Sequence, residues 1–197
     1  MDPASIKPAP GLTLATSLPD GAAGDMRAAM SRSMPTSQQL LFDVQVEPST
    51  EPAKPTDPAV FGALDPKLKG KPLARYGFEY IFPARQIAFK DGADGTHNGA
   101  VEFDIAAYDS QGKLVNSLSQ SIKLPLSEEQ YRQLLKGPFR FFQQLDLPAG
   151  QLFLRIGVLD QTSNKVGTLE IPRLVEKKQA APRPDASVTA PGGKDDR

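Results

Sequence analysis

Residues 145–172, LDLPAGQLFLRIGVLDQTSNKVGTLEIP, decide the fold class of this chain. A turn at Pro148 to Gly150 leads into a long strand-like stretch, and a polar turn at residues 160–164 leads into a second stretch that stops at Pro172. Alternation of apolar and polar residues with period two is typical of antiparallel strands that bury one face. This hairpin therefore predicts an antiparallel β-sheet protein, and it contains no catalytic motif.

The same alternation recurs along much of the chain. We expect strands at residues 41–47, 75–82, 86–89, 101–108, 113–124, 139–145, 151–160 and 165–171. Gly112 stands where a tight turn between two of them needs a positive φ, and Leu154 and Ile156 are expected to be core residues. The series predicts a mainly-β, antiparallel two-sheet sandwich of the immunoglobulin or fibronectin-III type, with a β-barrel as the alternative.

One short helix is expected to interrupt the strands at residues 127–135. Ser127 and Gln130 have the spacing of a capping box, in which the serine hydroxyl accepts from the glutamine backbone amide and the glutamine side chain reaches back. The pair Gly137-Pro138 ends the helix. Because this helix lies between two strands, we expect it to cross from one sheet to the other.

The domain is predicted to span residues 35–174, with a long proline-rich loop at residues 48–72. Its protease-resistant part is expected to comprise residues 40–47 and 74–172, since those carry the alternating pattern. Residues 175–197 are polar and predict a disordered tail.

The N-terminal residues 1–34 are interpreted as disordered or linker sequence, because they are rich in Pro, Ala, Ser and Gly. A short helix is possible at residues 22–33. Asp25 would cap that helix, and Met26 and Met30 would share one of its faces. A marginal helix or a linker is the favoured interpretation of this segment.

Composition excludes several classes of function. Lys+Arg and Asp+Glu both number 23 in the 197 residues, so the formal net charge is zero and no field attracts nucleic acid or an anionic membrane. Cysteine is absent, which excludes disulfides, thiolate nucleophiles and cysteine-ligated zinc. No apolar run reaches the length of about eighteen residues that a membrane span needs. Residues 1–21 lack the apolar region of a signal peptide, so the chain is expected to be cytoplasmic or a piece of a longer exported protein.

The single histidine, His97, lies in the stretch DGADGTHNGA at residues 91–100. We interpret it as a solvated loop residue, because no acid–histidine–nucleophile arrangement is readable around it. Asp91, Asp94 and Asn98 offer oxygen ligands of the kind that Ca²⁺ prefers. Asp, Asn and Gly are also the residues that a tight turn requires, and the turn is the favoured interpretation.

Three further groups each have a functional and a structural interpretation. The turn at residues 160–164 superficially resembles an Asp-x-Ser-x-Ser metal site, but its spacing favours a hairpin turn. Glu128 and Glu129 are adjacent on a helix, so they favour the helix dipole and do not form a glycosidase pair. A row of aromatic residues could be a ligand platform but is more typical of a core: Tyr76, Phe78, Tyr80, Phe82, Phe139, Phe141 and Phe142.

Several motifs are similar to one bacterial family. They are Tyr108-Asp109-x-x-Gly112, Leu147-Pro148-x-Gly150, Leu154-Arg155-Ile156-Gly157-Val158-x-Asp160 and Val166-Gly167-Thr168-Leu169-x-Ile171-Pro172. With them, residues 35–174 resemble the C-terminal module of the VWFA-related proteins of Acidobacteria and similar bacteria. In that family a von Willebrand factor A domain with a metal-ion-dependent adhesion site lies upstream, after a signal peptide. This chain contains neither, so no adhesion-site residue is carried over.

The resemblance implies a non-catalytic accessory or interaction module of an exported adhesion or scaffold-type protein, in the periplasm or outside the cell. Its partner would be another protein or the upstream A-domain of the same polypeptide. The alternative is a small-ligand or glycan-binding sandwich that uses the Asp91–Asn98 stretch or the aromatic row. We expect no enzyme, and we assign no catalytic, cofactor-binding or metal-binding residue.

Overall fold

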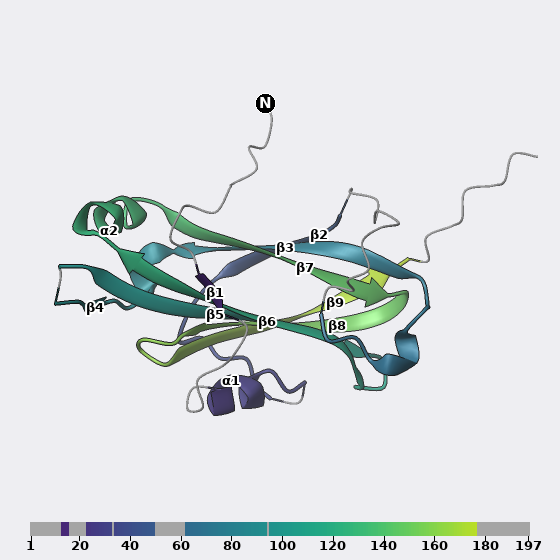
Figure 1. Cartoon of the computed structure of the whole chain (residues 1–197). Coiled ribbons are helices and arrows are strands. Elements are labelled where there is room, and N and C mark those ends of the chain that lie inside the picture. Colours follow the sequence, from purple (N-terminus) through teal and green to yellow (C-terminus); the bar gives the residue numbers. More distant parts are fainter. Residues whose placement is uncertain (1–12, 16–22, 33, 50–61, 94, 177–197) are drawn as a thin grey trace, which may run out of the picture.

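The computed structural model describes residues 13–15, 23–32, 34–49, 62–93 and 95–176. In this part of the chain two antiparallel β-sheets pack face to face (Figure 1), which confirms the predicted mainly-β sandwich. The predicted disorder of residues 1–21 is wrong for Thr13–Ala15, which form a strand paired with residues 121–123 of the chain, and the rest of that segment and residues 177–197 lie outside the described residues.

The larger sheet, sheet A, contains six strands: five in the order β1-β6-β5-β8-β9, and the short β4, which pairs with β5. Their bounds are β1 Thr13–Ala15, β4 Lys90–Asp91, β5 His97–Asp109, β6 Leu114–Leu126, β8 Gly150–Asp160 and β9 Lys165–Val175. Sheet B has the order β2-β3-β7, with bounds β2 Asp43–Pro48, β3 Leu73–Pro83 and β7 Pro138–Pro148. The last predicted hairpin is therefore the β8–β9 pair, and β8 lies inside sheet A.

The core lies between the two sheets, where side chains from alternate positions meet. The β3 aromatics Tyr76, Phe78, Tyr80 and Phe82 are all buried there, which confirms the core interpretation of that part of the aromatic row. On β8, Leu154 and Ile156 are fully buried, as predicted. The three β7 aromatics differ in burial: Phe139 is buried, Phe141 is half-buried and Phe142 is exposed.

The turn between β8 and β9 is built by side chains, as its sequence predicts. The Asp160 carboxylate accepts from the Thr162 backbone amide at 3.0 Å and from the Ser163 hydroxyl at 2.5 Å. Asn164 takes a positive φ of 58°, the left-handed conformation that Asn tolerates best after Gly. The Asp160 carboxylate also accepts from the Ala88 backbone amide, so it is engaged by the turn and by the segment before β4, while the Gln161 side chain donates to Glu102 and Ser121.

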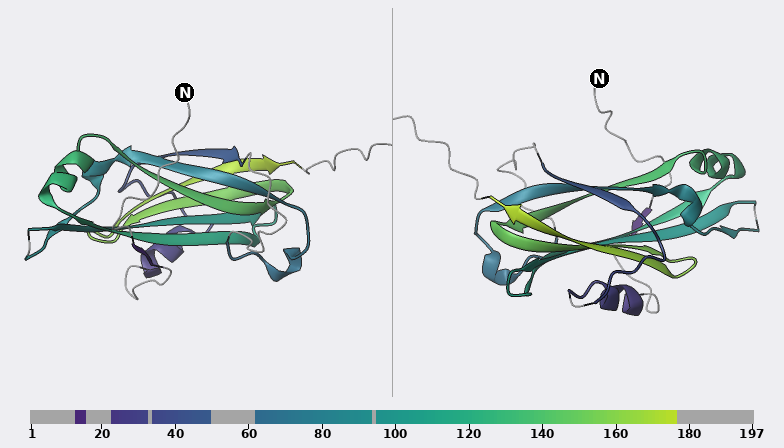
Figure 2. Two further views of the ribbon diagram at one scale, coloured as in Figure 1. Left: turned by 45° about the horizontal axis from the view of Figure 1, so that its top comes forward. Right: turned by 180° about the vertical axis from the view of Figure 1, so that it is seen from behind.

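The N-terminal boundary differs from the prediction. Helix α1 (Ala23–Ala29) packs on the outer face of sheet A (Figure 2), and Met26 and Met30 are buried against Ala106, Leu159 and Val166. The sequence predicts that the two methionines share a face of the helix. It does not predict the surface that buries them, because that surface belongs to strands far away in the sequence. The helix begins before Asp25, which is therefore not its cap.

Smaller differences concern segments around the proline residues. Residues 86–89 do not form the expected strand, because the chain makes a 3₁₀ turn, η2 (Ala84–Gln86), directly after Pro83 and pairs again only at β4. Within the proline-rich loop, residues 50–61 lie outside the described residues, while η1 (Pro66–Leu68) is ordered by its Asp65 cap. At the other end, β9 continues through Val175, which is buried, one residue beyond the predicted domain.

Candidate functional site around helix α2

Helix α2 (Glu128–Leu134) stands at one end of the sandwich, next to β4 (Figure 1). It joins β6 of sheet A to β7 of sheet B, so the predicted crossover is confirmed. The capping box is also confirmed: the Gln130 backbone amide donates to the Ser127 hydroxyl, and the Ser127 amide donates to the Gln130 side chain. No residue of α2 is buried. A few side-chain contacts therefore hold this helix to the rest of the domain.

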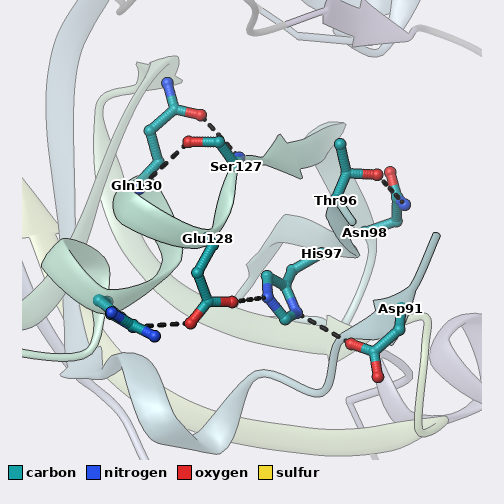
Figure 3. A network of polar contacts seen from close by, with 8 residues as sticks. Asp91, Thr96, His97, Asn98, Ser127, Glu128 and Gln130 are labelled. Atoms are coloured by element: carbon teal, nitrogen blue, oxygen red, sulfur yellow. Dashed lines mark hydrogen bonds and ion pairs between the residues drawn. The ribbon is translucent and has the colours of Figure 1, made fainter. Parts of the chain in front are cut away.

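His97 is the centre of those contacts. Its Nε2 lies 2.6 Å from Oε2 of Glu128 on α2, and its Nδ1 lies 2.9 Å from Oδ1 of Asp91 on β4 (Figure 3). His97 is the first residue of β5, and its side chain is only 17% exposed. The interpretation of His97 as a solvated loop residue is therefore wrong, because strand pairing with β4 and β6 starts at this residue.

The arrangement decides which chemistry the imidazole can perform. Two carboxylates face its two nitrogens, and each carboxylate can only accept a hydrogen bond, so both nitrogens donate in the doubly protonated form. The hydrogen bond to Glu128 raises the pKa of His97 above its ordinary value, and partial burial opposes that effect. The same pair lowers the pKa of Glu128. An imidazole engaged in this way has no free nitrogen to act as a general base.

Aromatic contacts complete the attachment of α2. The ring of Tyr131 stacks on His97, with the centroids 4.1 Å apart, and meets Phe89 edge-on at 5.1 Å. Further along the helix, Leu134 packs against the main core. The Arg132 Nε lies 2.6 Å from Oε1 of Glu128, one helical turn away, and so holds the second oxygen of that carboxylate. Glu128 is thus shared between the imidazole and a guanidinium.

The predicted calcium ligands are not brought together as a set. Asp91 points at His97, while the Asn98 side-chain amide donates to the Thr96 hydroxyl at 3.1 Å. Asp94 lies outside the described residues. Asp91 and Glu128 approach opposite nitrogens of one ring, so they do not converge on a common point. Among the described residues, no group of three His, Asp or Glu side chains is placed to hold a metal ion.

A cavity of about 380 Å³, open to solvent, lies at the other end of α2. One wall is the end of the helix and the following turn, and the other is the end of β3 with η2. The lining residues are Asp43, Ile81, Phe82, Pro83, Ala84, Arg85, Leu135, Lys136, Gly137 and Pro138. The lining combines apolar residues such as Ile81, Phe82 and Leu135 with the charged residues Asp43, Arg85 and Lys136.

Exposed apolar side chains accompany this cavity. Leu135, which lines it, is 40% exposed. Leu41 is 62% exposed, and its backbone is fixed beside the lining segment because the Gln86 side chain bonds both its amide and its carbonyl, at 2.9 and 2.8 Å. Leu135 thus offers an apolar side chain to a molecule that enters the cavity, and Leu41 is held near the lining residue Arg85 through Gln86.

Sequence reasoning missed both parts of this site. The sequence analysis explains Glu128 only by its favourable position in the helix dipole. Its pairing with His97, 31 positions earlier, depends on where β4, β5 and α2 meet in the fold. The cavity joins residues about 40–95 positions apart in the chain, for example Asp43, Ile81 and Pro138. The β3–β7 register, which pairs Pro83 with Pro138, is the structural fact that would have located it.

Comparisons with known proteins do not assign a family. No protein-family model matches the chain, and no curated protein matches it. A solved structure from Bordetella pertussis, named as an ApaA protein, matches 71% of this chain and 95% of that chain at 12% identity and a TM-score of 0.29. At that score the likeness carries no argument about fold or function. Among the described residues, no helix is both long and apolar enough to cross a membrane.

Proposed function

We propose that this chain is a non-catalytic protein-interaction module, and that the cavity at the end of α2 is its binding site. The observation that carries the proposal is the cavity itself, with apolar residues of β3 and of the turn after α2 in its lining and the exposed Leu135 among them. Interface centres typically combine apolar anchors with arginine and a polar rim. An open concavity suits one side chain of a partner segment better than a small molecule that is bound by enclosure.

The charges around the cavity indicate the chemistry of the partner. Arg85 and Lys136 are both exposed, and no carboxylate of the described residues forms an ion pair with either. Asp43, which pairs with Ile81 in the β2–β3 register, contributes one negative charge. The surplus is positive, so we infer a partner segment that carries an apolar side chain beside Asp or Glu.

The resemblance to VWFA-related modules fits this function, and it is the basis for the finer part of the proposal. We infer an immunoglobulin-like accessory domain of an exported adhesion or scaffold-type protein. Expression of the complete gene in its own host, followed by fractionation, tests that placement. Recovery in the periplasm or the medium agrees with it, and recovery in the cytoplasm contradicts it.

A peptide selection tests the binding site. A random heptapeptide library displayed on phage is panned on the full chain, and the selected peptides are measured on variants by fluorescence anisotropy. We expect peptides with an apolar residue next to Asp or Glu. Their binding should be lost in Leu135→Asp and weakened in Arg85→Glu, because the first places a carboxylate in the apolar wall and the second reverses a charge.

Leu114→Asp is the matched control. Leu114 is 43% exposed, close to the exposure of Leu135, but it lies at the start of β6 and does not line the cavity. This variant should bind the peptides like the wild type. Failure to select any peptide, or equal binding by all three variants, would show that the cavity is not a protein-binding site.

A further inference from the structure

We propose that Asp91, His97 and Glu128 form a pH-sensitive latch that positions the α2 wall of the cavity, so that loss of the proton from His97 loosens this wall and weakens binding. The consequence for binding rests on the proposed function. The latch itself does not, because it is a property of the helix attachment and can be measured without a partner.

The first step is that α2 connects the two sites. Glu128 is its first residue and pairs with His97, whereas Leu135 and Lys136 directly follow its last residue and line the cavity. A helix of seven residues is a single short rigid unit. Release at one end therefore changes the position of the other end.

The second step is that the latch is a major part of the attachment. None of the helix residues is buried, and its packing onto the domain relies on Tyr131 and Leu134. The Tyr131 ring lies on the imidazole itself, so the state of His97 acts on two contacts of the helix, while Tyr131 with Phe89 and Leu134 with the core provide the others. A surface helix attached by so few side chains belongs to the easily opened part of a fold.

The third step concerns the charges around His97. From β4 it meets Asp91, and from α2 it meets Glu128, which in turn is held by Arg132. Tyr131 of α2 faces the ring, and the β6 residue paired with His97 is the uncharged Leu126. Every ionised group in direct contact with the ring is thus a carboxylate, which favours the imidazolium.

The sign of the pH dependence follows. Because the pKa of His97 is raised in the folded protein, its ion pairs stabilise the latch fully below the ordinary value of 6.5 and are lost as the pH rises through the raised value. The lowered pKa of Glu128 means that its contribution is present above 4.5 and is lost in acid. The latch is therefore closed in mildly acidic solution and opens toward alkaline pH.

Nuclear magnetic resonance of the ¹⁵N-labelled full chain tests the latch. The His97 ring signal and the backbone amide signals of Leu135, Lys136 and Gly137 are followed from about pH 5.5 to about pH 9, the range in which a shifted histidine titrates. We expect the three amides to move with the same midpoint as the ring. Amides that stay unchanged while the ring titrates would overturn the latch.

Variants separate this effect from general pH effects. In His97→Gln the three amides should no longer titrate and should resemble the wild type at high pH. Glu128→Gln should give the same result, and it serves as the second variant if the first fails to fold. Glu129→Gln is the matched control, because Glu129 lies on the same helical turn but is exposed and makes no contact with His97. Amides that titrate alike in all variants would also overturn the latch.

A binding measurement extends the test to function. The selected peptide should bind the wild type severalfold more weakly at about pH 8.5 than at about pH 6, and His97→Gln should remove most of this difference. If the amides titrate as expected but no peptide binds, the latch holds and the proposed function fails. If a peptide binds equally at both values of pH while the amides are unchanged, the proposed function holds and the latch fails.

Discussion

Arg155 on β8 donates from Nε to the main-chain carbonyl oxygen of Ala29 at 2.9 Å and thereby ties helix α1 to sheet A. Its Nη2 donates to the carbonyl oxygen of Pro35 at 2.8 Å, and Glu170 lies 3.7 Å from its Nη1. The Arg155 side chain is 2% exposed. A buried guanidinium therefore lies between helix α1 and sheet A, where apolar side chains usually make the contact. Helix α1 and Pro35 are thus held on the outer face of sheet A by one buried side chain.

Replacement of Arg155 by Met should therefore destabilise the whole domain. It removes two hydrogen bonds from a charged donor to the carbonyls of Ala29 and Pro35, and a hydrogen bond to a charged group is worth about 1.5–3 kcal/mol. We expect a loss of roughly 2–5 kcal/mol in urea-induced unfolding. Arg140→Met is the control, because Arg140 is 46% exposed in its ion pair with Glu79 and such pairs are worth about 1 kcal/mol or less. Equal losses in the two variants would contradict this role of Arg155.

Two glycines of sheet A allow the N-terminal segment to approach closely, and they should respond differently to alanine. A methyl group at Gly167 would overlap the main-chain carbonyl of Leu40, and backbone atoms cannot turn aside as the end of a flexible side chain can. At Gly157 the methyl group would meet only the flexible ends of Met26 and Met30. Thermal denaturation should show a clearly larger loss for Gly167→Ala than for Gly157→Ala. The reverse order would mean that the segment around Leu40 is not seated on β9.

Asp104 on the outer face of β5 should make stability depend on pH. Burial raises the pKa of this carboxyl to about 7, against the hydrogen bond from Ser119 and with the help of the nearby Glu102. The folded state therefore holds a proton that the unfolded state loses near its ordinary pKa of 3.8. Stability should fall as the pH rises between these two values, by at most about 1.4 kcal/mol per pH unit, and level off above them.

The variant Asp104→Asn cannot ionise and should be the more stable protein at about pH 8, with a smaller difference near about pH 4. Ser119→Ala should act in the opposite direction, because it removes a hydrogen bond that favours the carboxylate. Urea midpoints measured across this range check both expectations. A difference between the Asn variant and the wild type that does not change with pH would contradict the raised pKa.

Leu154 should be among the most sensitive apolar positions. It is fully buried at the centre of the sandwich, so Leu154→Ala should cost about 2–5 kcal/mol. Leu174→Ala is the matched control, since Leu174 is 63% exposed on the neighbouring strand and should cost less than about 0.5 kcal/mol. A small loss at Leu154 in guanidinium unfolding would show that the inward face is assigned one residue out of register.

The sequence was sufficient to predict elements that are set by local patterns. Period-two alternation located the β3 aromatics and Leu154 in the core, and the capping box located α2. Side-chain turn chemistry likewise predicted the Asp160 turn. Each of these depends on residues close together in the chain.

Features that depend on long-range contacts were not predictable in this way. His97 is half-buried because β4, β5 and α2 converge on it, and its own neighbours in the sequence, Gly, Asp and Asn, are typical of a turn. The spacing of Met26 and Met30 predicts that they share a helix face, but it does not predict which sheet buries that face. Arg155 gave no signal of burial, because its partners are main-chain carbonyls that have no sequence signature.

The most direct test of a binding site at the end of α2 is a map of where a selected peptide touches the protein. The peptide is titrated into the ¹⁵N-labelled full chain in mildly acidic solution, and the backbone amide shifts are followed. The largest changes should cluster at residues 81–85 and 135–137, which line the cavity from both sides. Changes confined to another surface, such as the outer face of sheet A around α1, would contradict this assignment.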